Sequence, residues 1–251
     1  MRVLRRPDGS QVAEPCECRH EQRVAKLLER ARIPRRYSNC TLKNFETSFR
    51  GSHDSLRLAF LQADKFVTAY PIDTEGKGLL FTGTAGVGKT HLGVGLLHAL
   101  ITERGAQALF CDYRELLKEI QESYNPSTRT TELQVLRPVF QVEVLMIDDL
   151  GYIKPTEWVW DTVAVILNSR YNAKKTTIIT TNYPNLPPKL FRSQEEPKIS
   201  RQQRLADEAM REETLGDRIG DRMWSRLAEM CIEVNLIGDD LRQSVKRARL
   251  G

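Results

Sequence analysis

The chain has 251 residues, 40% of them hydrophobic and 28% charged, and this ordinary balance predicts a folded domain with one sizeable core. No apolar run reaches the roughly 18 residues that a membrane-spanning helix needs, and the basic start "MRVLRRPDGSQ" has no apolar stretch behind it, which argues against a secretory signal. The 5 cysteines are odd in number and scattered, which favours a reducing cytoplasm.

The net charge of +5 comes from the amino-terminal part of the chain. Residues 1–50 hold 12 Lys/Arg and 6 Asp/Glu, so the other residues together carry a charge close to zero. Such a basic segment suits nucleic acid or an acidic protein surface, and a solvated charged segment is an equally good interpretation. We therefore treat residues 1–50 as a basic segment that is a candidate for partner binding, and residues 51–251 as the main domain.

The periodicity of apolar residues predicts the elements in chain order. Residues 1–20 have a loop-like composition, a helical pattern follows at 21–33, and another covers 53–70. Further strands and helices then alternate. We expect strands at 78–82, 107–111, 143–147, 176–181 and 231–236, and helices at 88–104, 112–124, 156–172 and 217–229. The alternation predicts an α/β fold in which helices flank both faces of a parallel sheet.

One stretch breaks this alternation. Residues 184–215 are rich in proline and charge and poor in large apolar side chains, which predicts a surface insertion that is partly helical near 200–212.

The motif "GTAGVGKTH" directly follows the first of these strands and fits the phosphate-binding pattern G-x-x-x-x-G-K-[ST]. Its glycines let the backbone curl so that N–H groups point at phosphate oxygens, and the next helix adds its positive end. Lys89 brings a charge to the β- and γ-phosphates, and the Thr90 hydroxyl is a Mg²⁺ ligand. The predicted nucleotide contacts are Gly83, Thr84, Ala85, Gly86, Val87, Gly88, Lys89, Thr90 and His91. We expect no catalytic role for His91 or His98.

Two later motifs end in polar residues at strand ends. In "VLMIDD", Asp148 is expected to hold Mg²⁺ through water, and Asp149 to act as general base on the attacking water. The alternative is a pair of acids that only cap the next helix. In "TTIITTN", Asn182 is either a γ-phosphate sensor beside these acids or an ordinary turn residue.

Together with "GDRMWSRLAEMC" and the tail "GDDLRQS", these motifs resemble the AAA+ ATPases, specifically the DnaC/DnaI-type helicase loaders and the related IstB-type transposase helper ATPases. The resemblance implies a P-loop NTPase without a carboxyl-terminal lid domain, ATP bound between neighbouring subunits, and assembly on DNA. We expect an ATP-hydrolysing loader that acts on single-stranded DNA and a DnaB-like replicative helicase. The alternatives are a transposase helper, a non-catalytic ATP-dependent adaptor, and a small-molecule kinase, which would not need Asn182.

The resemblance also implies roles for single residues. Asp149 stands where many AAA+ proteins have Glu, which implies slow hydrolysis, and Arg242 matches a nucleotide-sensing arginine, although a solvated tail arginine would look the same. The "DRMWSRL" box implies an arginine that enters a neighbour's ATP site; by position we expect Arg226, then Arg222, with Arg218 structural. On one helix these three arginines would lie along one stripe and repel one another. Pairing of Arg218 with Asp221 and of Arg226 with Glu229 would partly relieve this repulsion.

Three further features have two interpretations each. Relatives often bind zinc through an additional Cys pair, but here only Cys16 and Cys18 are present, so we expect free thiols. Tyr37 and Phe45 either stack on the adenine or pack in the core. Trp158 and Trp160 lie on different faces of a helix, so that at least one of them is expected to be exposed to a partner.

Overall fold

The structure, a computed structural model, describes residues 2–5, 11–14, 17–49, 52–188 and 213–241. Its strands are β1 (Arg2–Arg5), β2 (Gln11–Glu14), β3 (Gly78–Gly83), β4 (Ala108–Asp112), β5 (Val144–Asp148), β6 (Thr177–Thr180) and β7 (Cys231–Leu236). Its α-helices are α1 (Glu17–Arg30), α2 (Asp54–Ala69), α3 (Lys89–Arg104), α4 (Tyr113–Glu122), α5 (Glu132–Gln141), α6 (Glu157–Asn172), α9 (Leu215–Ile219) and α10 (Asp221–Met230). Two short 3₁₀ turns, η1 (Arg35–Tyr37) and η2 (Leu42–Asn44), lie between α1 and α2.

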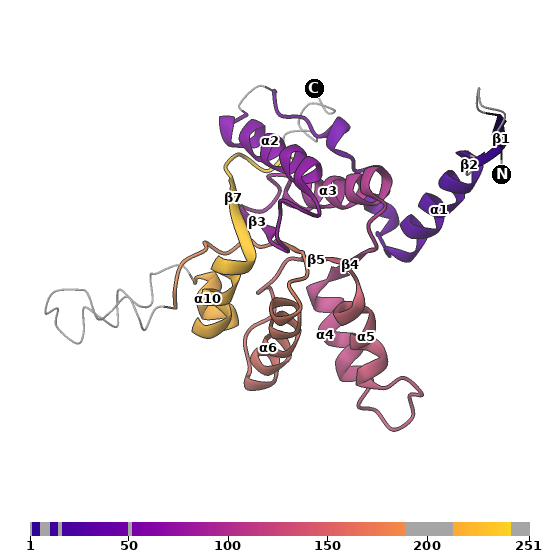
Figure 1. The fold of residues 1–251 in the computed structure, drawn as a ribbon. Helices are drawn as coiled ribbons and strands as arrows, with labels where there is room; N and C mark the ends of the chain where they lie inside the picture. The colour runs from indigo at the N-terminus through magenta and orange to yellow at the C-terminus, as the bar shows by residue number, and fades with distance from the viewer. Residues whose placement is uncertain (1, 6–10, 15–16, 50–51, 189–212, 242–251) are drawn as a thin grey trace, which may run out of the picture.

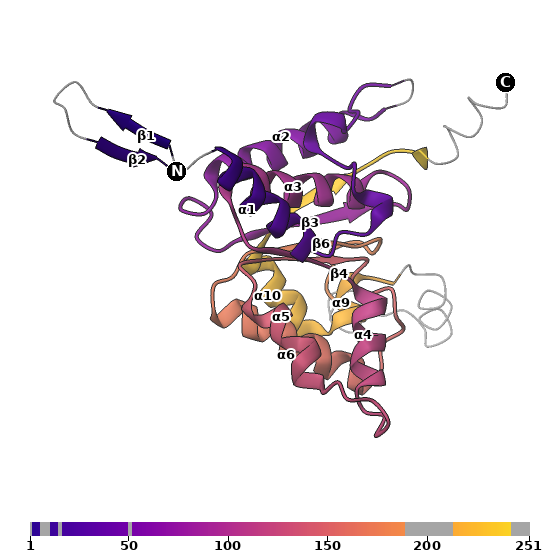
Figure 2. The same ribbon diagram turned by 90° about the vertical axis from the view of Figure 1, so that its right-hand side faces the viewer.

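Strands β3 to β7 form one parallel sheet in the order β4-β5-β6-β3-β7. Helices α1, α2 and α3 cover one face, and α4, α5, α6, α9 and α10 cover the other (Figures 1 and 2). Because both faces are buried, the strands are short runs of apolar residues rather than alternating ones. The predicted α/β fold is therefore confirmed, and each of the five predicted strands is present within one or two residues of its expected bounds.

The hydrophobic core is divided in two by the sheet. Leu79 and Phe81 of β3 pack with α2 and α3, whereas Leu80 between them packs with the helices of the other face. Leu42 and Phe45 belong to the first cluster, so residues before position 50 contribute side chains to the same core as α3.

The amino-terminal residues differ from the predicted loop. Strands β1 and β2 pair antiparallel, with Arg2 opposite Glu14 and Arg5 opposite Gln11, and α1 begins at Glu17. The hairpin extends away from the sheet beyond α1 (Figure 2). The prediction of a loop over 1–20 was therefore wrong for these ranges, because four-residue strands are too short to show a periodic pattern.

Helix α5 is an element that the pattern analysis missed. Its start signal is nevertheless present, because Thr131 and Gln134 form a reciprocal capping box at its amino terminus. Pro138 lies inside the helix and masks the periodicity, since proline in a helix interior normally argues against a helix.

The predicted helix 217–229 is in fact two helices, α9 and α10, separated by Gly220. Gly220 has φ 82° and ψ 154°, a conformation that is essentially restricted to glycine and that no helix can pass through. Arg218 therefore lies on α9, while Arg222 and Arg226 lie on α10, and the prediction of one arginine stripe was wrong.

The two described ends of the predicted insertion lie side by side. Leu215 N donates to Pro184 O over 2.9 Å, and Gly216 N donates to Leu186 O over 3.1 Å. A side chain at position 216 would meet Pro188 N at 2.5 Å, so only glycine allows this approach. The helical pattern predicted near 200–212 lies outside the described residues.

Candidate nucleotide-binding site

The predicted site residues come together at the carboxyl edge of the sheet. The loop after β3 carries the glycine-rich motif, β5 ends in Asp148, and the chain after β6 carries Asn182. Strands β3 and β5 both flank β6, so parallel alignment brings all three ends to one place. Ligands of open α/β sheets characteristically bind at this edge.

The glycine-rich loop has a shape that side chains would prevent. Gly83 and Gly86 have φ 135° and 83°, both in the region that favours glycine. A Cβ at Gly83 would collide with the carbonyl oxygen of Leu236, and one at Gly86 with the Asp240 carboxylate. The loop is therefore shaped by its own backbone and by residues that follow β7.

Lys89 is 5% exposed and its amino group is fully engaged. Its Nζ donates to Gly83 O and Thr84 O, each over 2.7 Å, and to Asn182 Oδ1 over 2.6 Å. The ammonium is thus held at the loop and tied to the end of β6. A polyphosphate would offer this cation stronger, charged acceptors in the same place.

Thr90 and Asp148 form the second contact between the loop and the acidic strand. Thr90 Oγ1 donates to Asp148 Oδ1 over 2.9 Å, and Thr180 Oγ1 donates to the same oxygen over 2.6 Å. The pKa of Asp148 is raised to about 6, chiefly by burial and also by the nearby Asp149 and Asp112, while the hydrogen bonds from Thr180 and Thr90 act in the opposite direction. Sequence reasoning did not identify Thr180, although it is the polar residue two positions before Asn182 in "TTIITTN".

Asp149 has φ 57°, a left-handed conformation that Asp tolerates better than most residues. Its N–H donates to Thr180 Oγ1 over 2.9 Å, and Asn182 Nδ2 lies 3.4 Å from its Oδ1. A hydrogen-bonded chain therefore runs from Lys89 through Asn182 to Asp149. The rare backbone conformation thus lies in a segment that is hydrogen-bonded on both sides, at the carboxyl edge of the sheet.

These donors fit Mg²⁺, which binds through one or two carboxylates and keeps several waters. A hydroxyl and a carboxylate within hydrogen-bond distance of each other, beside a phosphate-binding loop, are such a set. Within the part of the chain that the structure describes, no group of three or more His, Cys, Asp or Glu side chains is arranged to hold a metal by itself.

Some predicted residues cannot be placed. Arg242 and Cys16 lie outside the described residues, and Cys18 lies in α1 with its side chain undescribed. Residues just before Arg242 do reach the site, since Thr84 Oγ1 donates to Gly238 O and Leu241 N donates to Gly86 O, each over 3.2 Å. This contact was not predicted.

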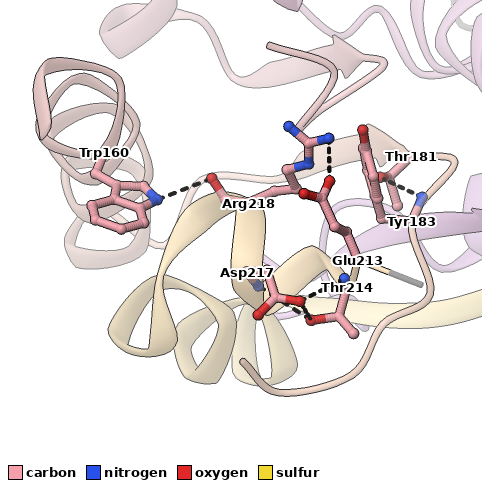
Figure 3. Close-up of polar contacts among 7 residues, drawn as sticks. All are labelled: Trp160, Thr181, Tyr183, Glu213, Thr214, Asp217 and Arg218. Carbon is pink, nitrogen blue, oxygen red and sulfur yellow. Dashed lines mark hydrogen bonds and ion pairs between the residues drawn. The ribbon is translucent and has the colours of Figure 1, made fainter. Parts of the chain in front are cut away.

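The arginines occupy different environments. Arg218 forms an ion pair with Glu213 rather than the expected Asp221, and its guanidinium lies 4.5 Å from the centre of the Tyr183 ring (Figure 3). The Arg218 side chain is 12% exposed, and its Cβ packs on Gly151. Arg218 therefore contacts the loops that follow Asp149 and Asn182.

The other two arginines lie on α10. Arg222 is exposed. Arg226 lies over the Tyr171 ring at 5.6 Å, and Tyr171 in turn donates to Glu229 Oε2 over 2.5 Å.

The aromatic residues singled out in the sequence differ in their exposure. Phe45 is 8% exposed and packs edge-on against His91 as part of the core, whereas Tyr37 is half-buried and packs against Phe110 at the edge of the same core. Trp160 is 42% exposed, and its indole N–H donates to the carbonyl oxygen of Arg218 over 3.1 Å (Figure 3). The expectation that one tryptophan is exposed is confirmed.

Comparison with known proteins gives the family. Residues 9–187 match the family described as IstB-like ATP binding protein. The chain belongs to this family. The replicative helicase loader DnaC of Escherichia coli (strain K12) is 23% identical over 160 residues, which cover 64% of this chain and 62% of the relative. DnaI of Bacillus subtilis (strain 168) is 30% identical over 132 residues, or 52% of this chain and 41% of the relative.

Solved structures show the same fold. A crystal structure of the DnaC helicase loader superposes with a TM-score of 0.62 and 29% identity, covering 81% of this chain and all of that one. AMPPCP-bound DnaA from Aquifex aeolicus has a TM-score of 0.55 at 18% identity, with 84% and 55% of the two chains covered, which supports the fold alone. The AAA+ P-loop fold predicted from the motifs is confirmed.

The chain spans 62% of the length of the DnaC relatives that it matches. Within the described residues, no helix combines the length and apolar character needed to cross a membrane.

Proposed function

We propose that this member of the IstB-like family is an ATP-binding and ATP-hydrolysing helicase loader, which acts on a replicative helicase and on single-stranded DNA. The observation that carries the nucleotide part is the hydrogen-bonded chain from Lys89 through Asn182 to Asp149. The relatives named helicase loaders favour this function over the transposase helper, adaptor and kinase alternatives.

In this proposal each residue of the site has one role. The backbone of residues 83–90 surrounds the phosphates, and Lys89 moves its three hydrogen bonds from protein oxygens to phosphate oxygens. Thr90 and Asp148 would hold Mg²⁺, Asp148 through water, and the ion would supply positive charge against the phosphates. Asn182 orients the attacking water, and Asp149 accepts its proton. Because the Asp149 side chain is one methylene shorter than Glu, we expect slow hydrolysis.

Self-association completes the site in this proposal. Arg226, with Arg222 as second candidate, reaches a neighbour's γ-phosphate from α10. Its guanidinium offsets the negative charge that develops on the γ-phosphate during hydrolysis. Arg242 remains a proposed nucleotide contact. Residues 1–50 are proposed as the segment that binds the helicase, and residues 51–251 as the ATP-binding domain.

Two exposed aromatic groups near the loop between β5 and α6 suit single-stranded DNA. Tyr124 is 51% exposed and packs edge-on against Trp158, while Tyr152 is 52% exposed with the Arg114 guanidinium 4.6 Å from its ring centre. These groups come from α4 and the turn after it, from the loop that follows β5, and from the first turn of α6. Aromatic rings that stack on bases, beside cations that meet phosphates, bind single strands without reading sequence. We therefore expect salt-sensitive DNA binding here.

Affinity capture from the source cell in the presence of ATP tests the proposal. We expect a hexameric helicase to be recovered with the wild-type chain and lost with Lys89→Ala, which also abolishes binding of labelled ATP. Lys174→Ala, at an exposed position away from the loop, serves as control. Recovery of a transposase in place of a helicase would overturn the loader assignment.

A further inference from the structure

Residues 39–45, which we call the strap, lie against the first two turns of the P-loop helix α3. Leu42 and Phe45 of the strap are each 8% exposed. A side chain at Gly95 would meet the Thr41 backbone carbon at 2.8 Å, and one at Gly88 would meet the Phe45 ring at 3.1 Å. The strap therefore packs closely on α3 at two glycines, Gly88 at the amino-terminal cap of the helix and Gly95 within it.

One side chain of α3, His91, joins the helix to the strap through Asn44 and also through a hydrogen bond with the Thr41 backbone. His91 Nε2 lies 2.9 Å from Asn44 Oδ1, and Phe45 packs edge-on against the His91 ring at 5.5 Å between centres. Asn44 Nδ2 donates to Asn39 O over 2.6 Å, which fixes the amide orientation and leaves Oδ1 facing His91. Because Oδ1 only accepts, His91 donates from Nε2.

Asn44 is also the residue that shapes the strap. Its Oδ1 accepts the Thr41 N–H over 2.8 Å, and its own N–H donates to Thr41 Oγ1 over 3.3 Å. Removing the Asn44 amide would therefore disturb the conformation of the strap itself. Changing His91 would instead weaken the attachment of the strap to α3.

The strap continues toward the amino-terminal segment through successive hydrogen-bonded turns. Cys40 N donates to Tyr37 O over 2.9 Å, and Tyr37 N donates to Pro34 O over 2.8 Å. Just after α1, Ala31 O accepts from Phe110 N of β4 over 2.8 Å. His91 directly follows Lys89 and Thr90, so the strap connects the phosphate-binding turn with α1.

We propose that His91 is a positioning residue which, through Asn44, transmits nucleotide binding at Lys89 and Thr90 to the strap and onward to α1. His91 does not itself contact the nucleotide in this arrangement. The inference rests on the proposed function, because it assigns a route by which ATP controls the segment proposed to bind the helicase. It also replaces the direct nucleotide contact that the motif alone predicted for His91.

Hydrogen exchange measured by mass spectrometry on the full chain, with and without a non-hydrolysable ATP analogue, tests this route. Peptides over 83–92 report the P-loop and peptides over 36–46 report the strap, in which the amides of Cys40, Thr41, Asn44 and Phe45 are hydrogen-bonded. In the wild type, we expect the analogue to slow exchange in both peptides, by about fivefold in the strap, which corresponds to one hydrogen bond.

His91→Leu keeps an apolar side chain against Phe45 but removes the bond to Asn44. We expect the analogue to protect its P-loop peptide and no longer its strap peptide. His91→Gln carries a side-chain N–H and is expected to restore the strap response, which a loss of packing alone would not allow. His98→Leu, at a half-buried histidine of the same helix, is the matched control and should respond like the wild type.

Nucleotide-dependent protection of the strap in His91→Leu equal to that in the wild type would overturn the inference. So would a wild-type strap that does not respond while its P-loop does. A wild-type P-loop that shows no protection would instead contradict the proposed nucleotide site, so the two failures are distinguishable.

Discussion

Thr180 donates its hydroxyl hydrogen to Asp148 Oδ1 over 2.6 Å, and it accepts the N–H of the next acid, Asp149, over 2.9 Å. One hydroxyl on β6 thus orients both residues of the acidic motif on β5. Its hydrogen bond only partly offsets the burial that raises the pKa of Asp148 to about 6 from an ordinary value of 3.8.

This raised pKa predicts that Asp148→Asn stabilises the nucleotide-free protein at neutral pH. A carboxyl group that binds its proton more tightly when folded lowers stability above pH 6, and this cost disappears as the pH falls toward 4. The variant is expected to gain on the order of 2 kcal/mol at pH 8 and about half as much at pH 5. Urea denaturation at the two pH values measures the difference. A variant that is less stable than wild type at pH 8 would contradict this account.

The proposed transfer of an arginine between subunits predicts complementation. Arg226→Ala should lower the ATPase rate under oligomerising conditions by about 10³-fold or more if the arginine acts as such residues do in related chemistry. Mixing it with Lys89→Ala subunits should restore part of the rate, because each variant supplies what the other lacks. An unchanged rate for Arg226→Ala would shift the role to Arg222, which the same mixing experiment tests.

Gly220 predicts a backbone cost without a packing cost. Nothing lies within 4 Å of a Cβ built at this position, yet its φ and ψ are accessible essentially only to glycine. Gly220→Ala should therefore destabilise the protein by about 1–3 kcal/mol. Ser225→Ala, on the exposed face of α10, is the control and should change stability little. Equal melting temperatures for both variants would argue that the break between α9 and α10 carries no strain.

Arg170 predicts the largest loss of stability. It is 0% exposed, and its guanidinium donates to Thr177 Oγ1 and to four backbone carbonyls of α5, β6 and their neighbouring turns. Arg170→Met would remove the guanidinium donor from all of these acceptors, of which Thr176 O keeps the N–H of Leu145 over 3.1 Å, and each acceptor left buried without a donor costs about 1–3 kcal/mol. We expect unfolding to be easier by at least about 3 kcal/mol in urea titrations, whereas Lys174→Met, exposed nearby, should change little.

The aromatic surface predicts a fluorescence signal for DNA. Binding of oligo-dT should quench Trp158, and Tyr124→Ala should weaken the affinity by about 1–3 kcal/mol, as expected for loss of one stacking contact. Affinity should fall steeply with salt. Leu133→Ala, at an exposed apolar position of α5, is the control. Binding that is unaffected by Tyr124→Ala would place the DNA elsewhere on the protein.

Local chemistry explains why so much of the site could be predicted. The glycines, Lys89 and Thr90 are consecutive, so their spacing alone specifies a phosphate loop, and strand-end residues such as Asp148 and Asn182 meet because parallel strands end at one edge. Thr180 and the residues 238–241 could not be predicted in the same way, because their roles depend on register and on a chain segment that returns from far along the sequence.

The arginine box shows most clearly which features follow from the sequence and which depend on the tertiary structure. The sequence by itself determined the α/β fold, the phosphate loop, and the order of its polar strand ends, since each depends on short-range pattern. Only the tertiary structure decided that Arg218 leaves the stripe, because the φ of Gly220 ends a helix that periodicity alone would continue. It also decided that Arg218 pairs with Glu213 and that His91 faces Asn44, because such partners are selected by packing between segments that spacing cannot relate.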